Sequence, residues 1–329
     1  TLELGTDQGL VGVGLTFFGG ALTPALKAAV DALAGLVVGD DPTQVEAIAA
    51  KLRRAAGNSG PGGIFTLALS AVDIACWDLK GKAVGQSVCA LLGGSRDRVP
   101  AYASGALMRP HPVDYLAKAG PRLRDMGFRQ MKMQCGSEPT VAASVERVSV
   151  MREAIGPDVD LMCDINQLWS VNHAIEVGRR LEPYHLYWLE DPVAHDDYAG
   201  LARVADALDT PIAAGEYHYG LVPFRHLLEA RSIDIVMIDL VRVGGITQWM
   251  KVAGMAEAFN RPVVSHLIPE IHVHLVAAIP NGLTVEYMPW TLQLFEETPA
   301  IEGGSLVVPR KPGLGLAFDQ AAIKRYQVG

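Results

Sequence analysis

The segment at residues 234–247, D-I-V-M-I-D-L-V-R-V-G-G-I-T, decides the fold. Its first half is an almost continuous apolar run, which is typical of a strand buried on both faces of a parallel sheet. The run ends on Asp239, and the pair Gly244 and Gly245 then turns the chain into the next helical segment. In a barrel of parallel strands, a polar residue at the C-terminal end of a strand faces the mouth where catalysis takes place. The segment therefore predicts a barrel strand that ends in a functional acid.

Seven further apolar runs alternate with helical patterns, in the rhythm of repeated β-α units. The eight runs occupy residues 99–104, 130–135, 159–164, 186–190, 211–216, 235–239, 262–266 and 283–287. A doubly wound open sheet is the alternative, but such a sheet usually has a glycine-rich phosphate-binding turn after its first strand. No such turn follows the first run. The pattern therefore predicts an α/β barrel over residues 98–295.

Residues 1–97 show a different pattern, a hairpin over 1–20 followed only by helical segments. The helical segments cover residues 24–38, 42–56 and 64–92, the last with a break near Gly85. We expect a separate α+β capping domain here. Because the sequence opens as if in the middle of a hairpin, we expect that domain to be truncated at its N-terminus. Residues 296–329 hold turn signals and no further β-α unit, so we expect them to complete the capping domain.

The composition argues against several classes of partner. The formal net charge of −8 over 329 residues is unfavourable for nucleic-acid binding, and no apolar stretch is long enough to span a membrane. Four cysteines stand in apolar segments without a C-x-x-C pair: Cys76, Cys89, Cys135 and Cys163. This pattern favours buried free thiols in a reduced, cytoplasmic protein.

Three consecutive runs end in, or just before, a carboxylate. The acids are Asp164, Glu190 and Glu216, and 26 residues separate each from the next. Three acids that converge at one end of a barrel suit a hard divalent cation such as Mg²⁺, which prefers oxygen ligands. The alternative is that each acid caps the helix after it, but three acids in succession favour the metal site.

Further polar residues end the other runs. His266 follows Asp239 by one β-α unit, and a carboxylate next to an imidazole fixes its tautomer and raises its basicity, as a general base requires. Lys132 and Gln134 lie two apart, so they share one face of their strand, and we expect Lys132 to be a counter-charge for an anionic substrate. Glu286 is expected to be either a neutral acid that donates a hydrogen bond to the substrate or a structural carboxylate.

These residues resemble one enzyme family over essentially the whole chain. The order Asp164, Glu190 in W-L-E-D-P, Glu216 in A-A-G-E, Asp239 in D-x-x-R-x-G-G and His266 in S-H-L is similar to the mandelate racemase subgroup of the enolase superfamily. Residues 71–82, A-V-D-I-A-C-W-D-L-K-G-K, are also similar to the family's capping-domain signature.

The resemblance implies a modified (β/α)7β barrel under an α+β capping domain, with Mg²⁺ held by Asp164, Glu190 and Glu216. It implies that a carboxylate substrate loses its α-proton to give an enediolate. Asp239 and His266 would be the base pair, Glu286 the hydrogen-bond donor to the substrate carboxylate, and Lys132 a contact to that carboxylate. Asn166 is similar to a residue that contacts a substrate hydroxyl. The resemblance also suggests a homo-oligomer.

One departure from the family pattern bears on the reaction. Many members have K-x-K on the second strand, whereas this chain has K-M-Q, so Gln134 stands where a second base would be. An amide cannot accept a proton at neutral pH, and a racemase needs a proton acceptor and a proton donor on opposite faces of the α-carbon. A single base suffices for β-elimination. We therefore expect an acid-sugar dehydratase, acting on an aldonate or aldarate, that gives a 2-keto-3-deoxy acid.

Two other functions remain open at this point. A racemase or epimerase would use Lys132 or a water molecule as its second base, and a non-catalytic binding protein would have to retain all the site residues without using them. His218 could reach the mouth and contact substrate, whereas His195, His272 and His274 are expected in packing or on helix surfaces. Phe17 and Phe18 would be either part of a loop over the site or an ordinary core pair. The sequence does not identify the sugar acid.

Overall fold

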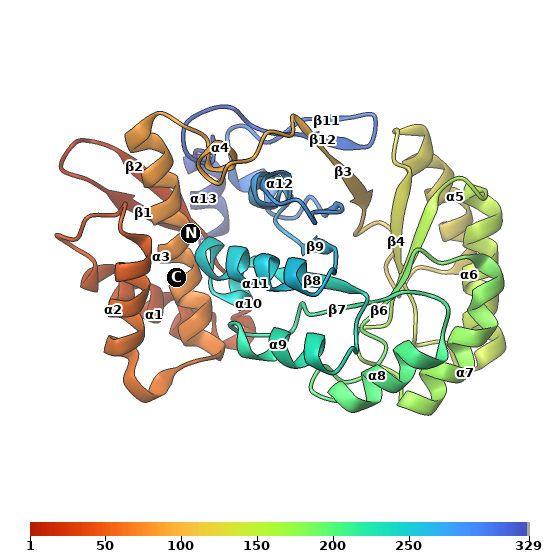
Figure 1. The fold of residues 1–329 in the computed structure, drawn as a ribbon. Helices are drawn as coiled ribbons and strands as arrows, with labels where there is room; N and C mark the ends of the chain where they lie inside the picture. The colour runs from red at the N-terminus through yellow and green to blue at the C-terminus, as the bar shows by residue number, and fades with distance from the viewer. Residues whose placement is uncertain (328–329) are drawn as a thin grey trace.

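The N-terminal part of the chain is built around one long helix (Figure 1). The computed structural model describes residues 1–327, and it begins with an antiparallel hairpin of β1 (Leu2–Gly5) and β2 (Val11–Gly14). The helices that follow are α1 (Thr23–Leu36), α2 (Val45–Ala56), α3 (Gly63–Val84) and α4 (Val88–Leu91), with 3-10 turns η1 (Gly20–Leu22) and η2 (Gly57–Ser59). Because α3 is apolar on nearly all sides, it is buried between β2, α1 and the short barrel helix α10 (Leu240–Val243). The predicted hairpin and helices are confirmed, and Gly85 ends α3 in the left-handed conformation.

Eight parallel strands form the barrel. They are β3 (Arg98–Ala103), β4 (Gln130–Gln134), β5 (Asp160–Asp164), β6 (Trp188–Glu190), β7 (Ile212–Ala214), β8 (Ile235–Asp239), β9 (Val263–His266) and β10 (Val285–Tyr287). Each strand from β3 to β8 pairs with the next, and β10 pairs with β3. The backbone N–H of Leu283 donates to the carbonyl of Val263, which joins the chain leading into β10 to β9 and closes the barrel. All eight predicted runs are strands.

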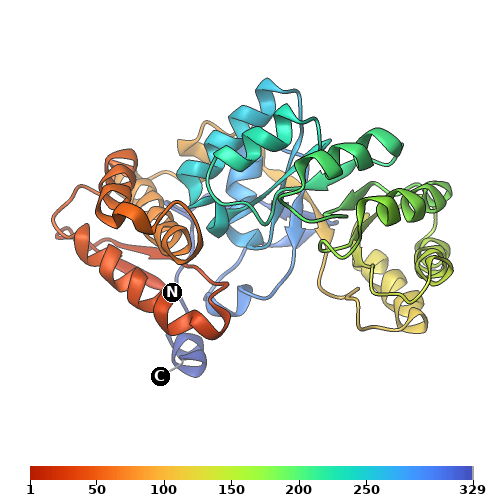
Figure 2. The same cartoon turned by 90° about the horizontal axis from the view of Figure 1, so that it is seen from below.

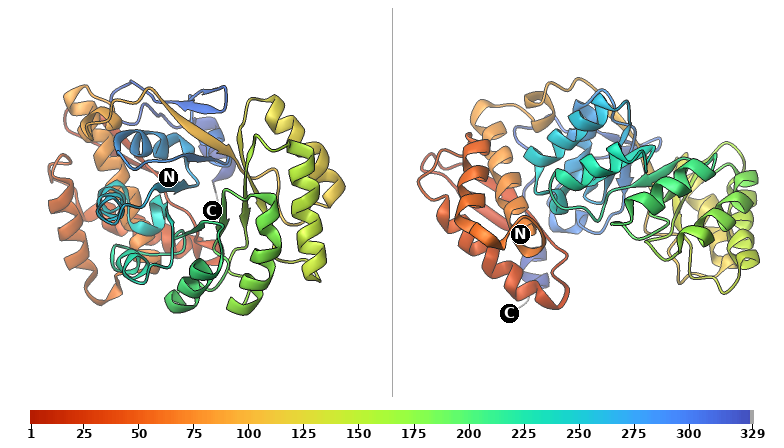
Figure 3. Two further views of the ribbon diagram at one scale, coloured as in Figure 1. Left: turned by 45° about the vertical axis from the view of Figure 1, so that its right-hand side comes forward. Right: turned by 60° about the horizontal axis from the view of Figure 1, so that its bottom comes forward.

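Seven helices connect these strands and surround the barrel. They are α5 (Val113–Asp125), α6 (Val141–Ile155), α7 (Val171–Leu181), α8 (Tyr198–Ala207), α9 (Val222–Glu229), α11 (Ile246–Ala258) and α12 (Pro269–Ala278), with a 3-10 turn η3 (Glu182–Tyr184) after α7. Figures 2 and 3 show α5 to α8 on the side of the barrel away from the N-terminal helices. The predicted (β/α)7β barrel is therefore confirmed. Among the described residues, no helix is both long and apolar enough to cross a membrane.

The C-terminal segment runs back over the molecule without adding another β-α unit. Its elements are η4 (Leu292–Leu294), β11 (Ile301–Glu302), β12 (Ser305–Val307) and α13 (Gln320–Tyr326), and β12 pairs antiparallel with β3. The buried carboxylate of Asp78 on α3 accepts hydrogen bonds from the backbone N–H of Val13 at 2.9 Å and of Leu314 at 2.7 Å. This segment therefore contacts the N-terminal helices as expected, while the division at residues 97 and 295 stays a prediction.

The register of the barrel strands brings the functional residues to one level. Asp164 is paired with Gln134 on one side and with Glu190 on the other, and Asp239 is paired with His266. Below that level the interior is filled by side chains from most of the strands, including Tyr102, Met162, Trp188, Met237 and Val264. The barrel is thus a packed core with a polar layer at the C-terminal ends of its strands.

Candidate active site

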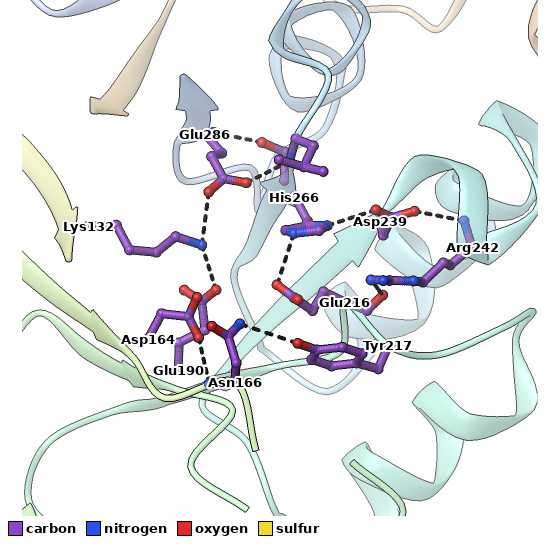
Figure 4. Close-up of polar contacts among 12 residues, drawn as sticks. Lys132, Asp164, Asn166, Glu190, Glu216, Tyr217, Asp239, Arg242, His266 and Glu286 are labelled. Carbon is purple, nitrogen blue, oxygen red and sulfur yellow. Dashed lines mark hydrogen bonds and ion pairs between the residues drawn. The ribbon is translucent and has the colours of Figure 1, made fainter. Parts of the chain in front are cut away.

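The predicted site residues meet at the C-terminal ends of the strands, where Figure 4 shows ten of the residues around the mouth. Each strand from β4 to β10 supplies at least one of them, either from its last residues or from the segment directly after it. The buried charged groups there are Lys132, Asp164, Glu190, Asp191, Glu216, Asp239, His266 and Glu286. This layer contains six carboxylates, one lysine and one histidine, so it is strongly suited to bind cations.

Asp239 and His266 form the predicted carboxylate–imidazole pair. Nδ1 of His266 lies 2.7 Å from Oδ2 of Asp239, and the other carboxylate oxygen accepts the backbone N–H of Val241 at 2.9 Å and of Arg242 at 2.7 Å. Because those two N–H groups hold the carboxylate in place, Nδ1 carries a proton toward Asp239 and Nε2 faces the mouth. Burial lowers the pKa of His266, but the Glu216 carboxylate and the bond to Asp239 outweigh it and raise that pKa to about 9. The imidazole is therefore strongly basic.

Lys132 bridges two acids in the floor of the site. Its Nζ lies 2.6 Å from Oε1 of Glu190 and 2.9 Å from Oε1 of Glu286, and all three side chains are buried. Burial alone would raise the pKa of Glu286, but the charges of Lys132 and His266 hold it down at about 2. The backbone N–H of Leu267 also donates to Glu286 at 2.6 Å. The cations and the N–H donor around Glu286 therefore favour its ionised form in this structure, and its role as a hydrogen-bond donor to the substrate stays a prediction.

The acids have the chemistry of a divalent cation site. Carboxylate oxygens of Glu190, Asp191 and Glu216 lie within 4.8 Å of one another, and one oxygen each of Asp191 and Glu216 is buried without a hydrogen bond. Oε2 of Glu216 lies 3.1 Å from Nε2 of His266, but the geometry is not that of a hydrogen bond. Buried, unpartnered carboxylate oxygens are costly unless a cation compensates them, so these residues fit Mg²⁺.

Asp164 lies beside this group but outside the 4.8 Å cluster. One of its oxygens accepts the backbone N–H of Asn166 at 2.9 Å, and burial raises its pKa to about 6. The third member of the cluster is Asp191 and not Asp164, and the pattern of acids at strand ends did not point to Asp191. Asp191 follows the last residue of β6 and has a positive φ of 40°, which is uncommon for a residue other than glycine and is often found at functional sites. That backbone conformation could not be recognised from the sequence.

Two amides and a phenol form a hydrogen-bonded network beside Asp164. Nε2 of Gln134 donates to Oδ1 of Asn166 at 3.1 Å, and Nδ2 of Asn166 donates to the hydroxyl of Tyr217 at 3.2 Å. Arg109 also donates to Oδ1 of Asn166, at 2.9 Å, so this amide is fixed by three neighbours. Burial raises the pKa of Tyr217, and nearby acids raise it further. No group in this network is a proton acceptor at neutral pH.

Three further histidines, His218, His272 and His274, are buried. The ring of His218 contacts His195, Tyr198 and Phe224, and burial lowers its pKa to about 4. His218 has no hydrogen bond to the other predicted site residues, and its contact with substrate stays a prediction. His272 and His274 are fully buried, as expected for packing residues.

The comparisons with known proteins agree with this geometry. The sequence matches two family descriptions, "Enolase C-terminal domain-like" over residues 114–322 and "Mandelate racemase / muconate lactonizing enzyme, N-terminal domain" over residues 1–93. The chain belongs to the mandelate racemase/muconate lactonizing enzyme family of the enolase superfamily. The resemblance inferred from the strand-end motifs is thus confirmed.

Relatives within this family are dehydratases and cycloisomerases. L-talarate/galactarate dehydratase from Salmonella typhimurium is 33% identical over 320 residues, covering 97% of this chain and 80% of the relative. 3,6-Anhydro-alpha-L-galactonate cycloisomerase from Streptomyces coelicolor is 35% identical, covering 100% of this chain and 91% of the relative. The structure of L-talarate dehydratase from Polaromonas sp. JS666, complexed with Mg and L-glucarate, superposes with a TM-score of 0.94 at 35% identity, covering 99% of this chain and 91% of that one.

Proposed function

We propose that this protein is a Mg²⁺-dependent acid-sugar dehydratase that removes the proton next to the substrate carboxylate and expels the β-hydroxyl. The observation that supports this most is the single base: His266 is held by Asp239 at 2.7 Å, whereas Gln134 and Asn166 are amides, bonded to each other and to the phenol of Tyr217. The relatives named as talarate/galactarate, arabinonate and galactonate dehydratases support the same reaction class.

Asp164, Glu190 and Glu216 would hold the ion, with Asp191 next to them. Mg²⁺ when bound supplies positive charge that stabilises the negative charge developing on the substrate carboxylate. Lys132 adds a positive charge on the same side, because its Nζ lies between Glu190 and Glu286 at the floor of the mouth. The substrate carboxylate is therefore oriented toward β4, β5 and β6, with its α-carbon toward His266.

His266 performs both proton transfers. Nε2 accepts the proton from C2, and the resulting imidazolium is stabilised by Asp239 through Nδ1. The same Nε2–H then donates its proton to the departing C3 oxygen on the same face, so that the C3–O bond breaks with loss of water. The enol that remains tautomerises to a 2-keto-3-deoxy acid. All atoms and the one proton are accounted for without a second base.

Racemisation or epimerisation is the less favoured alternative. It needs a second proton carrier on the face opposite His266, and Gln134, which stands where the resemblance implies a second base, is an amide bonded to Asn166. Lys132 is the nearest amine, but Glu190 and Glu286 raise its pKa well above the usual value despite its burial, so it remains protonated. A protonated lysine can donate a proton but cannot first accept one.

Cycloisomerisation is a second candidate, because the chain is 35% identical to a cycloisomerase over its full length. The chemistry at His266 is the same, except that the departing β-oxygen belongs to a ring and stays attached to the product. The product is then an isomer of the substrate and no water is released.

A library of acid sugars and their lactones, incubated with protein and Mg²⁺ in D₂O, tests these assignments. A keto-acid assay and mass measurement read elimination, and NMR at C2 reads proton exchange. We expect keto acid with loss of water from a linear acid, and neither keto acid nor C2 exchange from His266→Asn. Exchange at C2 with inversion and no keto acid would establish epimerisation. A keto acid of unchanged mass would establish cycloisomerisation, and dehydration retained in His266→Asn would refute the assigned base.

A further inference from the structure

Arg242 places a cation at the mouth of the site that the reaction described above does not use. It follows Asp239 on α10, and its guanidinium reaches back between Asp239 and Tyr217 to the Glu216 segment, as Figure 4 shows. Its carbon Cζ lies 3.8 Å from the ring centroid of Phe18 and 4.9 Å from that of Tyr217. Stacking on these rings covers the faces of the guanidinium and leaves its N–H groups, which lie in the plane, for hydrogen bonding.

Most of those N–H groups have no protein acceptor among residues 1–327. One donates to the carbonyl oxygen of Glu216 at 3.0 Å, and no other side-chain hydrogen bond of Arg242 is found in that range. Although six carboxylates line the mouth, none of the described ones forms an ion pair with Arg242. Arg109 and Arg147 differ in this respect, because each of them donates to several backbone carbonyls. Arg242 is partly exposed, so its free donors are accessible to a ligand.

The substrate chemistry supplies the matching group. Lys132 lies between Glu190 and Glu286 at the floor of the mouth, so the proposed function assigns it and the metal site to the carboxylate at C1. An aldarate has a second carboxylate at the far end of its carbon chain, whereas an aldonate has a neutral hydroxymethyl group there. A planar guanidinium with free N–H groups is the side chain best suited to bind a carboxylate through two hydrogen bonds.

We propose that Arg242 binds the distal carboxylate of a dicarboxylic acid sugar, and that it makes this protein selective for aldarates over aldonates. The inference rests on the proposed function, since it assigns the substrate class of that site. Phe18 contributes through its position: it comes from the N-terminal segment, stacks on Arg242 and lies parallel to His266 at a centroid distance of 6.4 Å. Phe18 thereby fixes the guanidinium beside the base.

Binding to a variant without turnover tests the proposal directly. In a His266→Asn background with Mg²⁺, calorimetry would measure the affinities for C6 acids that differ only in having a carboxylate or a hydroxymethyl group at C6. We expect the aldarate to bind at least tenfold more tightly than its matched aldonate. Arg242→Gln should reduce that ratio by about tenfold to a hundredfold, the range for a hydrogen bond between charged groups. Arg242→Lys should retain part of the ratio, because the charge remains and the fork is lost.

Two controls separate binding from general effects. Arg225→Gln removes the same charge from an exposed residue on α9 that pairs with Glu229 at 3.6 Å, and it should leave the ratio unchanged. Phe18→Leu removes the ring next to Arg242. Because this variant keeps the guanidinium, it should lower the ratio less than Arg242→Gln does. An equal loss in both variants would show that Arg242 acts only by positioning Phe18, and the proposal would be wrong.

The remaining outcomes are also decisive. Equal affinity for both acids in the parent protein, no binding of either, or a ratio unchanged by Arg242→Gln each overturns the assignment of Arg242. An aldarate that binds in an Arg242-dependent way but is not dehydrated by the His266-containing enzyme supports Arg242 and refutes the dehydratase. Dehydration of aldonates alone supports the dehydratase and refutes the role of Arg242.

Discussion

Replacing Asp239 with asparagine should inactivate the base without unfolding the site. Two backbone N–H groups, from Val241 and Arg242, point at one carboxylate oxygen, so the amide introduced by Asp239→Asn must place its own oxygen there. Its NH₂ group then faces Nδ1 of His266, where the carboxylate oxygen lies 2.7 Å away in the parent protein. Nδ1 must become the acceptor, and the proton moves to Nε2. An Nε2–H at the mouth cannot accept the C2 proton.

The size of the effect follows from the cost of restoring the reactive tautomer. In that tautomer Nδ1 carries the proton, so the introduced amide must turn its oxygen toward Nδ1 and its NH₂ group toward the two backbone N–H groups. This arrangement loses one hydrogen bond, worth about 1 kcal/mol, and leaves two buried donors without an acceptor, at about 1–3 kcal/mol each. The total of roughly 5 kcal/mol corresponds to a rate loss on the order of 10³- to 10⁴-fold, similar to the loss when the carboxylate of a catalytic triad becomes an amide.

The assay is the initial rate of keto-acid formation and of C2 exchange in D₂O, with thermal unfolding as a check of the fold. Both rates should fall together, because the step that is lost is removal of the C2 proton. Asp234→Asn is the matched control, since that residue precedes the same strand and pairs with Arg261 on a partly exposed surface. An Asp239→Asn variant that keeps more than about a tenth of the parent rate would refute the reasoning.

Three further predictions concern stability and protonation. Asp78→Asn should lower the free energy of unfolding, measured by urea titration, by about 3 kcal/mol, because one amide oxygen cannot accept both buried N–H groups. Asp78 also pairs with Lys82, four residues on; Asp31 forms an exposed pair with Lys27 at the same spacing, so Asp31→Asn should have no measurable effect in the same titration. Burial lowers the pKa of His274 to about 4, so unfolding takes up a proton as pH falls below about 6.5. The stability advantage of the parent over His274→Gln should therefore shrink by about 2 kcal/mol between pH 6.5 and 5; a constant difference would contradict this. At pH 8, Mg²⁺ binding should release about one proton more from the parent than from His266→Asn. The reason is that the pKa of His266 near 9 depends on the Glu216 carboxylate, which the ion would share. Calorimetry in buffers of different ionisation enthalpy measures the number of protons released. Equal release would show that His266 is not coupled to the ion.

The barrel could be predicted because its signals are local and repeated. Each strand is a short apolar run between turn residues, and eight such runs in series leave few alternatives. The site residues followed from the same pattern, since a residue at the end of a parallel strand must lie at the mouth. Asp239 and His266 are in register on adjacent strands, as their spacing of one β-α unit predicts.

The parts that the sequence did not predict depend on side chains that reach across the structure. Arg242 stands in the D-x-x-R-x-G-G stretch without a predicted role, and only the fold brings Phe18 from the N-terminal segment onto its guanidinium. The position of the Asp191 side chain in the cluster depends on a positive φ, which the local sequence does not indicate. The surroundings of Glu286 could not be predicted either, because the sequence shows that acids are numerous, but not that Lys132 and the N–H of Leu267 contact this one.

Glu216 has two possible partners, and this links cation binding to the reactivity of the base. In this structure one of its oxygens lies 3.1 Å from Nε2 of His266, the nitrogen that must accept the substrate proton. The same carboxylate belongs to the cluster suited to a divalent cation. A carboxylate that shares its charge with a cation attracts the imidazole proton less, so we expect a filled cation site to lower the pKa of His266 and to favour the neutral form that can accept a proton. The enzyme would then hold its base in an inactive, protonated form until the group that stabilises the product of proton removal is in place.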